Sequence, residues 1–164
     1  MKDELIQKMK NVFGDDQKRI NHALAVLKYA EQIHSAEGGD LIVIAAAAIL
    51  HDIGIHQAEL KYDSAAGKYQ EIEGPPIAEK ILNDDGFGSG KIEHICKIIA
   101  NHHSAKDIDT LEFRVIWDAD WLVNIPDECG EMNESKLKEF ISRIFKTQTG
   151  RQIAKELYLH ENRN

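Results

Sequence analysis

Histidine and aspartate side chains that can bind a metal ion recur along this 164-residue chain. His51 and Asp52 are adjacent, and they end a strongly apolar run over residues 41–50. Unpaired polar groups are costly in apolar surroundings, so these two groups need a partner, and a divalent cation would satisfy both. Further candidate ligands lie before and after this pair: His22, His102, His103, Asp118 and Asp120. The ordered series of His and Asp residues therefore indicates a metal site that the fold assembles.

The positions of the histidines on their expected helices decide whether they can meet. Each residue of a helix advances by about 100°, which puts His22 at the edge of the apolar arc of a helix over 15–36. Taken alone, such a histidine is more often a core or boundary residue than a ligand. His51 and Asp52 would diverge by about 100° within a regular helix, so both can reach one ion only near a helix end. Gly54 indicates such an end.

Two pairs of candidates stay ambiguous from helical spacing alone. Asp118 and Asp120 lie about 100° to either side of the apolar stripe of a helix over 110–125, so periodicity leaves open which carboxylate faces the site. His102 and His103 end an apolar helical run, where partly positive histidines are favourable. The same two histidines could instead contact phosphate, transfer protons or bind a second metal ion.

Helical patterns dominate the chain, and few stretches alternate with the period of two that is typical of strands. Apolar spacing, with Gly, Pro and capping residues at the boundaries, predicts helices over 3–13, 15–36, 41–52, 75–84, 90–103, 110–125, 134–146 and 149–161. The polar, aperiodic segment 55–73 is expected to be a long loop, and such loops are often functional or mobile. Asp109 and Glu112 resemble a capping box at the start of the helix over 110–125.

We therefore expect an all-α fold, a single globular helical bundle over residues 1–164. Its core would lie over about residues 18–125, and C-terminal helices over about 134–161 would pack on it. The chain is long enough to bury a core of this size. Trp117 and Trp121 could pack against those C-terminal helices or against a second subunit, so a homo-oligomer stays open.

Composition restricts the classes of partner. The formal net charge of −8 argues against a general nucleic-acid binder, which usually carries a basic patch, but a bound metal ion could still attract a nucleotide. Two cysteines are too few for a disulfide framework or a cysteine-based zinc site. The N-terminus lacks the apolar core of a signal peptide, and the run over 41–50 is too short to span a bilayer. We expect a cytoplasmic protein that acts on neither membranes nor nucleic-acid polymers.

The joint pattern resembles the HD superfamily of metal-dependent phosphohydrolases over about residues 18–125. The matching pieces, in order, are His22 in an early helix, AAAAILHDIG at 45–54, IIANHH at 98–103 and DADWL at 118–122. The AAAAILHDIG segment is specific, and a chance match to it together with the other pieces is not expected.

The resemblance implies an all-α core and one divalent metal ion. The ligands would be His22, His51, Asp52 and one aspartate of DADWL. The family's Ala-Asp-x-Leu pattern favours Asp120 as that aspartate, with Asp118 as the second choice. Two imidazoles and two carboxylates form a mixed nitrogen and oxygen shell, which suits Mn²⁺, Fe²⁺, Co²⁺, Ni²⁺ or Zn²⁺.

The resemblance further implies hydrolysis of a phosphate ester or anhydride in a small, nucleotide-like substrate. The metal ion would act as a Lewis acid, and metal-bound water would be the nucleophile. His51, Asp52, His102 and His103 would form the catalytic centre. The alternative is a catalytically weak HD module that binds a metal ion or a ligand for sensing or regulation. Metal-dependent turnover of phosphorylated compounds would distinguish the two.

Other residues are candidates for binding the substrate. Three lysines could meet its phosphates, although each can equally be a solvated surface lysine: Lys61, Lys68 and Lys106. Tyr62 and Tyr69 could stack on a nucleotide base.

Two departures from relatives narrow the expected chemistry. Dinuclear relatives usually have an extra histidine where this chain has Gly74, which argues against a complete dinuclear site. Relatives that hydrolyse guanosine tetraphosphate, and some deoxynucleotidases, carry a catalytic glutamate where this chain has Ile55. Those two activities are less expected here, unless their acid–base group comes from His56, Glu71 or Glu73.

Overall fold

The structure is a computed structural model that describes residues 1–160, and every regular element within them is a helix. In chain order the helices are α1 (Lys2–Phe13), α2 (Gln17–Glu37), α3 (Leu41–Leu50), α4 (Ile55–Tyr62), α5 (Gly67–Asp84), α6 (Ser89–Asn101), α7 (Leu111–Cys129), α8 (Glu134–Ile144) and α9 (Gln148–Tyr158). The prediction of an all-α bundle is confirmed. The expected last helix, 149–161, ends at Tyr158, and position 161 lies outside the described residues.

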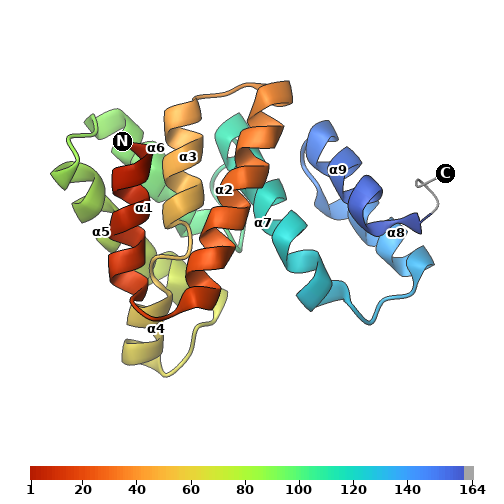
Figure 1. The fold of residues 1–164 in the computed structure, drawn as a ribbon, viewed down its shortest axis with the longest axis horizontal. Coiled ribbons are helices and arrows are strands. Elements are labelled where there is room, and N and C mark those ends of the chain that lie inside the picture. The colour runs from red at the N-terminus through yellow and green to blue at the C-terminus, as the bar shows by residue number, and fades with distance from the viewer. Residues whose placement is uncertain (161–164) are drawn as a thin grey trace.

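Helix α3 forms the centre of the bundle and packs against α1, α2, α6 and α7. Figure 1 shows α8 and α9 beyond α7, at the end of the molecule opposite α1 and α5. Asp40 begins α3 as predicted, because its carboxylate accepts hydrogen bonds from the backbone N–H groups of Ile42 and Val43. Every residue from Val43 to Leu50 is at most 2% exposed. This burial carries the end of α3, and the residues that follow it, into the interior.

One segment, Leu41–Tyr62, is long and apolar enough to cross a membrane by length and composition alone. In the folded chain, 78% of its most apolar stretch is buried inside the protein. Packing in the core therefore accounts for the apolar character of this segment.

The prediction of a long loop over 55–73 is wrong. Helix α4 and the first part of α5 occupy this segment, and only residues 63–66 between them are non-helical. The buried stripe of α5 repeats every four residues but begins with Gln70 and Gly74, which carry no apolar signal. Pro75 and Pro76 lie inside α5, where proline removes backbone N–H donors and normally marks a helix start.

Two glycines allow α5 to pack directly against the turn that follows α3. A Cβ atom on Gly54 would lie 2.5 Å from the backbone nitrogen of Gly74 and 2.8 Å from its Cα. Gly74 is also enclosed on its other side, because a Cβ atom there would lie 2.8 Å from Cγ2 of Ile99. The turn carrying His51 and Asp52 therefore contacts α5 through backbone atoms.

The start of α7 differs from the predicted capping box. Thr110, not Asp109, caps the helix, and its hydroxyl accepts a hydrogen bond from the N–H of Phe113. Asp109 instead accepts two hydrogen bonds from Arg114, at 2.8 and 2.6 Å. Glu112 accepts a hydrogen bond from the N–H of Asp40 and so connects α7 to the start of α3. The predicted cap lies one residue before the observed one, because Asp109 and Thr110 are both favourable N-cap residues.

Two tryptophans join α7 to the C-terminal helices. The indole N–H of Trp117 donates to the carbonyl oxygen of Ile144 at 3.1 Å. Trp121 packs edge-on against Phe140, with ring centroids 5.2 Å apart. Both tryptophans therefore contact α8 within the chain, which was one of the two alternatives that the sequence left open.

Candidate metal centre

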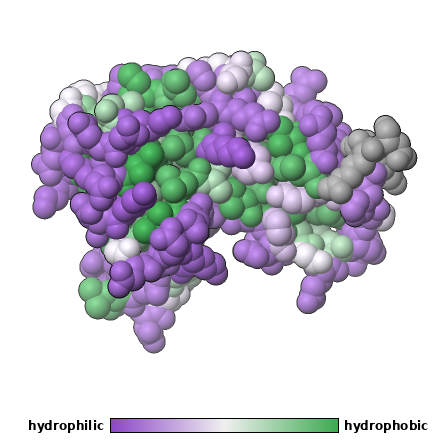
Figure 2. Space-filling model, viewed as in Figure 1, coloured by the Kyte–Doolittle hydropathy of each residue, from purple (hydrophilic) through white to green (hydrophobic). Residues whose placement is uncertain are grey.

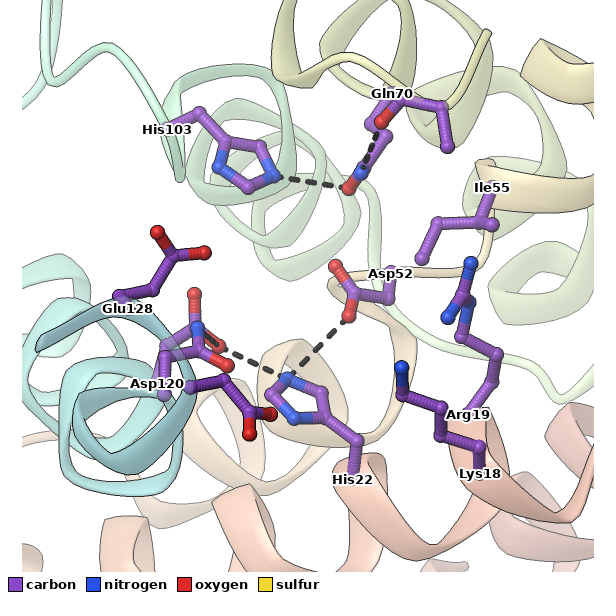
Figure 3. A pocket seen from close by; sticks show the side chains of 12 residues that line it. Lys18, Arg19, His22, Asp52, Ile55, Gln70, His103, Asp120 and Glu128 are labelled. Carbon is purple, nitrogen blue, oxygen red and sulfur yellow. Dashed lines mark hydrogen bonds and ion pairs between the residues drawn. The ribbon is translucent and has the colours of Figure 1, made fainter. Parts of the chain in front are cut away.

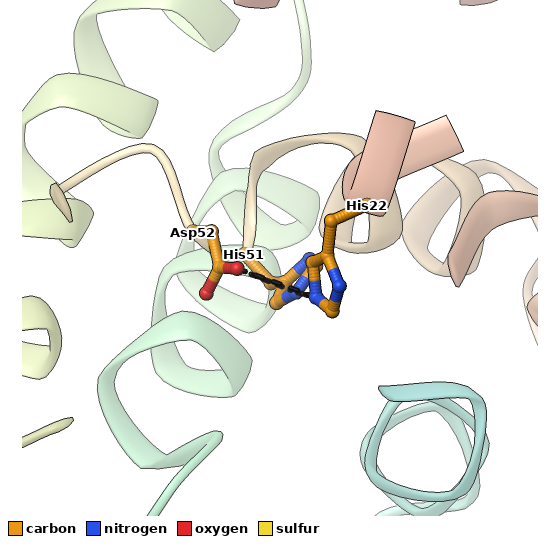
Figure 4. A group of neighbouring side chains, drawn as sticks. All are labelled: His22, His51 and Asp52. Atoms are coloured by element: carbon orange, nitrogen blue, oxygen red, sulfur yellow. Dashed lines mark hydrogen bonds and ion pairs between the residues drawn. The ribbon is translucent and has the colours of Figure 1, made fainter. Parts of the chain in front are cut away.

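Three separate elements carry the candidate ligands into one cluster. His22 lies in the second turn of α2, and Asp120 lies midway along α7. His51 and Asp52 begin the turn directly after α3. Figure 4 shows the imidazoles of His22 and His51 facing one another beside the Asp52 carboxylate. The structure thus brings together four side chains that are far apart in the sequence.

His22, His51 and Asp52 form the tightest group among these residues, with ligand atoms that all lie within 4.8 Å of one another. His22 Nε2 is 3.2 Å from His51 Nε2 and 2.9 Å from Asp120 Oδ1. Asp52 Oδ2 is 3.4 Å from both imidazole nitrogens, and His51 Nε2 is 3.4 Å from Asp120 Oδ1. With metal–ligand bonds of about 2.1 Å, adjacent ligands of one ion are about 3.0 Å apart in an octahedron and about 3.4 Å apart in a tetrahedron. The separations within His22, His51 and Asp52 fit this range, and so do those from Asp120 to the two imidazoles, so these side chains can lie around one ion.

Backbone carbonyls determine which ring nitrogen of two histidines points into the site. His51 Nδ1 lies 2.7 Å from the carbonyl oxygen of Ala48, and His102 Nδ1 lies 2.7 Å from that of Ile99. A carbonyl oxygen only accepts hydrogen bonds, so each Nδ1 carries the hydrogen and each neutral ring keeps a lone pair on Nε2. Contacts of this kind orient metal-binding histidines in proteins.

The Nε2 atom of His102 has an unusual environment for a polar atom. It is buried, makes no hydrogen bond with any of residues 1–160, and lies 3.3 Å from Asp52 Oδ1. The lone pairs of His102 Nε2 and Asp52 Oδ1 then face one another, which is unfavourable unless a cation or a proton lies between them. This orphaned nitrogen is a second sign that the site is built for a positive charge.

The charges of the cluster also favour a bound cation. Burial by itself would raise the pKa values of Asp52 and Asp120, but the neighbouring histidines lower both, that of Asp52 to well below its usual range. Burial would lower the pKa of His51, but the two carboxylates raise it well above its usual value. Both carboxylates are therefore ionised near neutral pH, and a divalent cation can neutralise them.

Asp118 and Asp120 have different partners, although they are two residues apart. Asp118 is 0% exposed and accepts hydrogen bonds from the N–H of Lys146 at 2.8 Å and from the N–H and hydroxyl of Thr147 at 2.7 and 2.6 Å. Burial raises the pKa of Asp118 to about 6. Asp120 faces the cluster, where Asn124 also donates to its Oδ1 at 3.0 Å. The geometry supports Asp120 as the ligand and gives Asp118 the role of holding the segment between α8 and α9.

A pocket of about 430 Å³ opens onto the cluster (Figure 3). In the space-filling view, the outline of the molecule is hollowed between the ends of α4 and α7, which both contribute lining residues (Figure 2). His22, Asp52 and Asp120 line the pocket, whereas His51 lies behind them and is fully buried. Other lining side chains come from α2, α5, α7 and the turn after α6: Lys18, Arg19, Gln70, His103, Asn124 and Glu128.

Lys18 and Arg19, which were not predicted as site residues, bring positive charge to the pocket. They precede His22 by four and three residues, which puts all three side chains on one face of α2. That spacing is the signal that could have found them. Figure 3 shows Lys18 and Arg19 on one side of the pocket and Glu128 on the other. Arg19 lies 3.6 Å from Glu59, whereas Lys18 has no ion-pair partner in the described part of the chain.

The three lysines predicted to bind phosphate do not line the pocket. Lys61 forms an ion pair with Glu73 at 3.0 Å. Lys68 lies over the ring of Tyr69, 4.9 Å from its centroid. Lys106 lies at a separate surface depression. Tyr62 and Tyr69 stack on one another with ring centroids 4.1 Å apart, so the two ring faces in this contact are closed to a nucleotide base.

The residues considered as substitutes for a catalytic glutamate also lie outside the pocket lining. Glu73 binds Lys61, and His56 lies 2.7 Å from Asp16 at the start of α2. Glu71 accepts hydrogen bonds from the backbone after α6. His103 does line the pocket. Desolvation of its ring lowers its pKa to about 4, and His102 acts in the same direction. It is therefore neutral near physiological pH.

Comparisons with known proteins bear on the family of this chain. The HD domain family model matches residues 19–125, which contain all four clustered residues. A comparison with curated proteins gives no match. The structure is similar to the crystal structure of a predicted HD superfamily hydrolase from an uncultured Thermotogales bacterium, with a TM-score of 0.71 and 26% sequence identity over 94% of this chain and 83% of that one. The chain belongs to the HD domain family.

Proposed function

We propose that the protein is a metal-dependent phosphohydrolase that cleaves a phosphate ester or anhydride bond of a small, nucleotide-like substrate. The observation that carries this proposal is the cluster of His22, His51 and Asp52, with Asp120 at 2.9 and 3.4 Å from the two imidazoles, beside a pocket. Membership of the HD family and similarity to a predicted HD superfamily hydrolase support it.

His22, His51, Asp52 and Asp120 would hold the ion, and their mixed donor set suits Mn²⁺, Fe²⁺, Co²⁺, Ni²⁺ or Zn²⁺. When bound, such an ion supplies a Lewis acid for the phosphoryl group and lowers the pKa of a coordinated water. The buried ligands would keep their positions in the absence of the ion, because hydrogen bonds to the backbone orient His51 and a hydrogen bond from Asn124 holds Asp120.

The side chains around the cluster can bind the rest of the substrate. Lys18 and Arg19 would donate charge-assisted hydrogen bonds to phosphate oxygens. The pocket volume of about 430 Å³ lies within the range of about 300–1,000 Å³ that is typical of small-molecule sites. No Phe, Tyr or Trp lines the pocket in the part of the chain that the structure describes. A nucleoside would therefore be held by hydrogen bonds, for example from Asn124, rather than by stacking.

The test is metal analysis followed by a substrate screen. The purified full-length chain, reconstituted with Mn²⁺, should contain about one ion per chain and hydrolyse members of a panel of nucleotides and other small phosphates. His51→Ala and Asp52→Ala should lose both the ion and the activity. His22→Gln changes a partly exposed ligand and should do the same while leaving the fold intact. Stoichiometric metal without turnover of any phosphate would favour the sensing module. No metal after reconstitution would exclude the metal-dependent hydrolase and leave a structural or ligand-binding role.

Replacing Lys18 is expected to weaken substrate binding. Lys18→Met should raise KM by about ten-fold or more, because a charge-assisted hydrogen bond contributes about 1.5–3 kcal/mol. The value of kcat should change less, since the metal ligands are untouched. The matched control is Lys28→Met, which removes an equal charge from an exposed position of the same helix outside the pocket lining and should leave KM unchanged. Equal effects of the two substitutions would show that Lys18 acts only through the net charge of the protein.

A further inference from the structure

The first turn of α5 holds the segment that follows α6. The Glu71 carboxylate accepts hydrogen bonds from the N–H groups of His103 and Ser104, at 3.1 and 3.0 Å, and from the Ser104 hydroxyl at 2.8 Å. Gly67 lies directly beneath the His103 ring, since a Cβ atom on Gly67 would lie 2.7 Å from Cγ of that ring. The third contact is a hydrogen bond from the His103 ring to Gln70. One helical turn thus fixes the backbone, the position and the orientation of His103.

The hydrogen bonds of Gln70 determine the tautomer of His103. The Gln70 amide nitrogen lies 2.7 Å from the carbonyl oxygen of Ala65, which can only accept, so the amide must donate there. Its oxygen, Oε1, consequently faces His103 Nε2 at 2.9 Å. Because Oε1 is also only an acceptor, Nε2 must carry the hydrogen. In a neutral ring the lone pair is then on Nδ1.

The direction of this lone pair connects the tautomer to the pocket. Figure 3 shows the second ring nitrogen of His103 on the side of the ring away from Gln70, and His103 itself lines the pocket. His51 and His102 have the opposite tautomer, because their Nδ1 atoms donate to backbone carbonyls. Hydrogen-bond partners within the chain therefore give His103 a different tautomer from His51 and His102.

We propose that Gln70 is a positioning residue that holds His103 as the Nε2–H tautomer, so that Nδ1 accepts a hydrogen bond from a water molecule or hydroxyl group in the pocket. Gln70 is 8% exposed and itself touches the pocket, but its amide is occupied on both sides by Ala65 and His103. In the proposed hydrolysis, on which this step rests, His103 would orient the attacking water toward the phosphorus atom.

Nuclear magnetic resonance tests the tautomer without any substrate. Long-range ¹H–¹⁵N spectra of the full chain loaded with Zn²⁺, assigned with a His103→Gln variant, should show a protonated Nε2 and an unprotonated Nδ1 for His103. In Gln70→Met the two nitrogen shifts should move toward averaged values, since the acceptor is gone, whereas Gln70→Glu should keep the protonated Nε2. A protonated Nδ1 in the wild type, or unchanged shifts in Gln70→Met, would overturn the proposal.

Kinetics tests the role of the tautomer once a substrate is known. Gln70→Met should lower kcat by about ten-fold, with KM and metal content unchanged, as is typical when a positioning contact is lost. Gln57→Met is the matched control, because Gln57 is exposed on α4 and does not line the pocket. An unchanged kcat in Gln70→Met alongside averaged tautomers would refute the positioning role. If the wild type hydrolyses no phosphate, the proposed activity fails, while the spectra still decide the tautomer.

Discussion

Asp120→Asn is expected to weaken metal binding by more than about 100-fold, whereas Asp118→Asn should bind metal normally and lose stability. Asp120 Oδ1 lies 2.9 Å from His22 Nε2 and 3.4 Å from His51 Nε2, so we expect its charge to contribute to metal binding. Asp118 accepts three hydrogen bonds from Lys146 and Thr147. The amide nitrogen of an asparagine would face these donors and leave at least one unpaired, at a cost of about 1–3 kcal/mol.

Metal titration and urea unfolding of the apoproteins measure the two effects separately. The apo form of Asp120→Asn should be no more stable than the wild type near neutral pH, because the histidines lower the pKa of Asp120 in the folded chain and its charge therefore favours folding. The opposite result, with metal affinity lost in Asp118→Asn and kept in Asp120→Asn, would assign the ligand to the other aspartate. Loss of metal in both variants without a change in stability would contradict the role given to Asp118.

Gly54→Ala is expected to lower the free energy of unfolding by about 3 kcal/mol, a large effect for one methyl group. The added Cβ would lie 2.5 Å from the backbone nitrogen of Gly74, and backbone atoms of a helix cannot move aside independently. Conformational strain is not the cause, because Gly54 has φ −85° and ψ −3°, values open to any residue. Helix α5 would have to shift away from the turn that carries His51 and Asp52, so metal affinity should fall as well.

Gly74→Ala provides the matched comparison for this prediction. Its Cβ would clash with Cγ2 of Ile99, at 2.8 Å, but lie at an ordinary 3.8 Å from the backbone nitrogen of Gly54, and a side chain can adjust its rotamer. We expect a loss of about 1 kcal/mol and near-normal metal affinity. The midpoint and slope of urea unfolding give the loss of stability for both variants, and metal titration gives the affinity. Equal losses in the two variants would show that the backbone contact between α5 and the turn is not the cause.

The sequence was most informative where a residue type has one dominant physical use. Asp40 before an apolar run predicted the start of α3, and the all-α class followed from helical periodicity. The clustering of His22 with His51 and Asp52 depended on a family resemblance, because no spacing rule connects separate helices. Periodicity could not choose between Asp118 and Asp120, since both flank the same stripe and only tertiary contacts separate them.

The failures have physical causes that can be named. Helix α5 was missed because its buried stripe begins with Gln70 and Gly74, whose burial depends on partners elsewhere in the chain. The lysines at 61, 68 and 106 were chosen for their charge, which every surface lysine shares. Lys18 and Arg19 were overlooked although they lie on the same helical face as His22. A search for cations three and four residues before a candidate ligand would have found them.

The hydrogen bonds of Asp118 give the C-terminal helices a part in the metal centre. The donors come from residues 146 and 147, beyond the segment 19–125 that matches the family model. Asp118 is less than one helical turn from Asp120 on the same rigid helix. Deleting the donors would leave a buried carboxylate without partners next to the ligand position. We therefore expect the smallest fragment that presents the candidate metal centre intact to be longer than the segment by which the family is recognised.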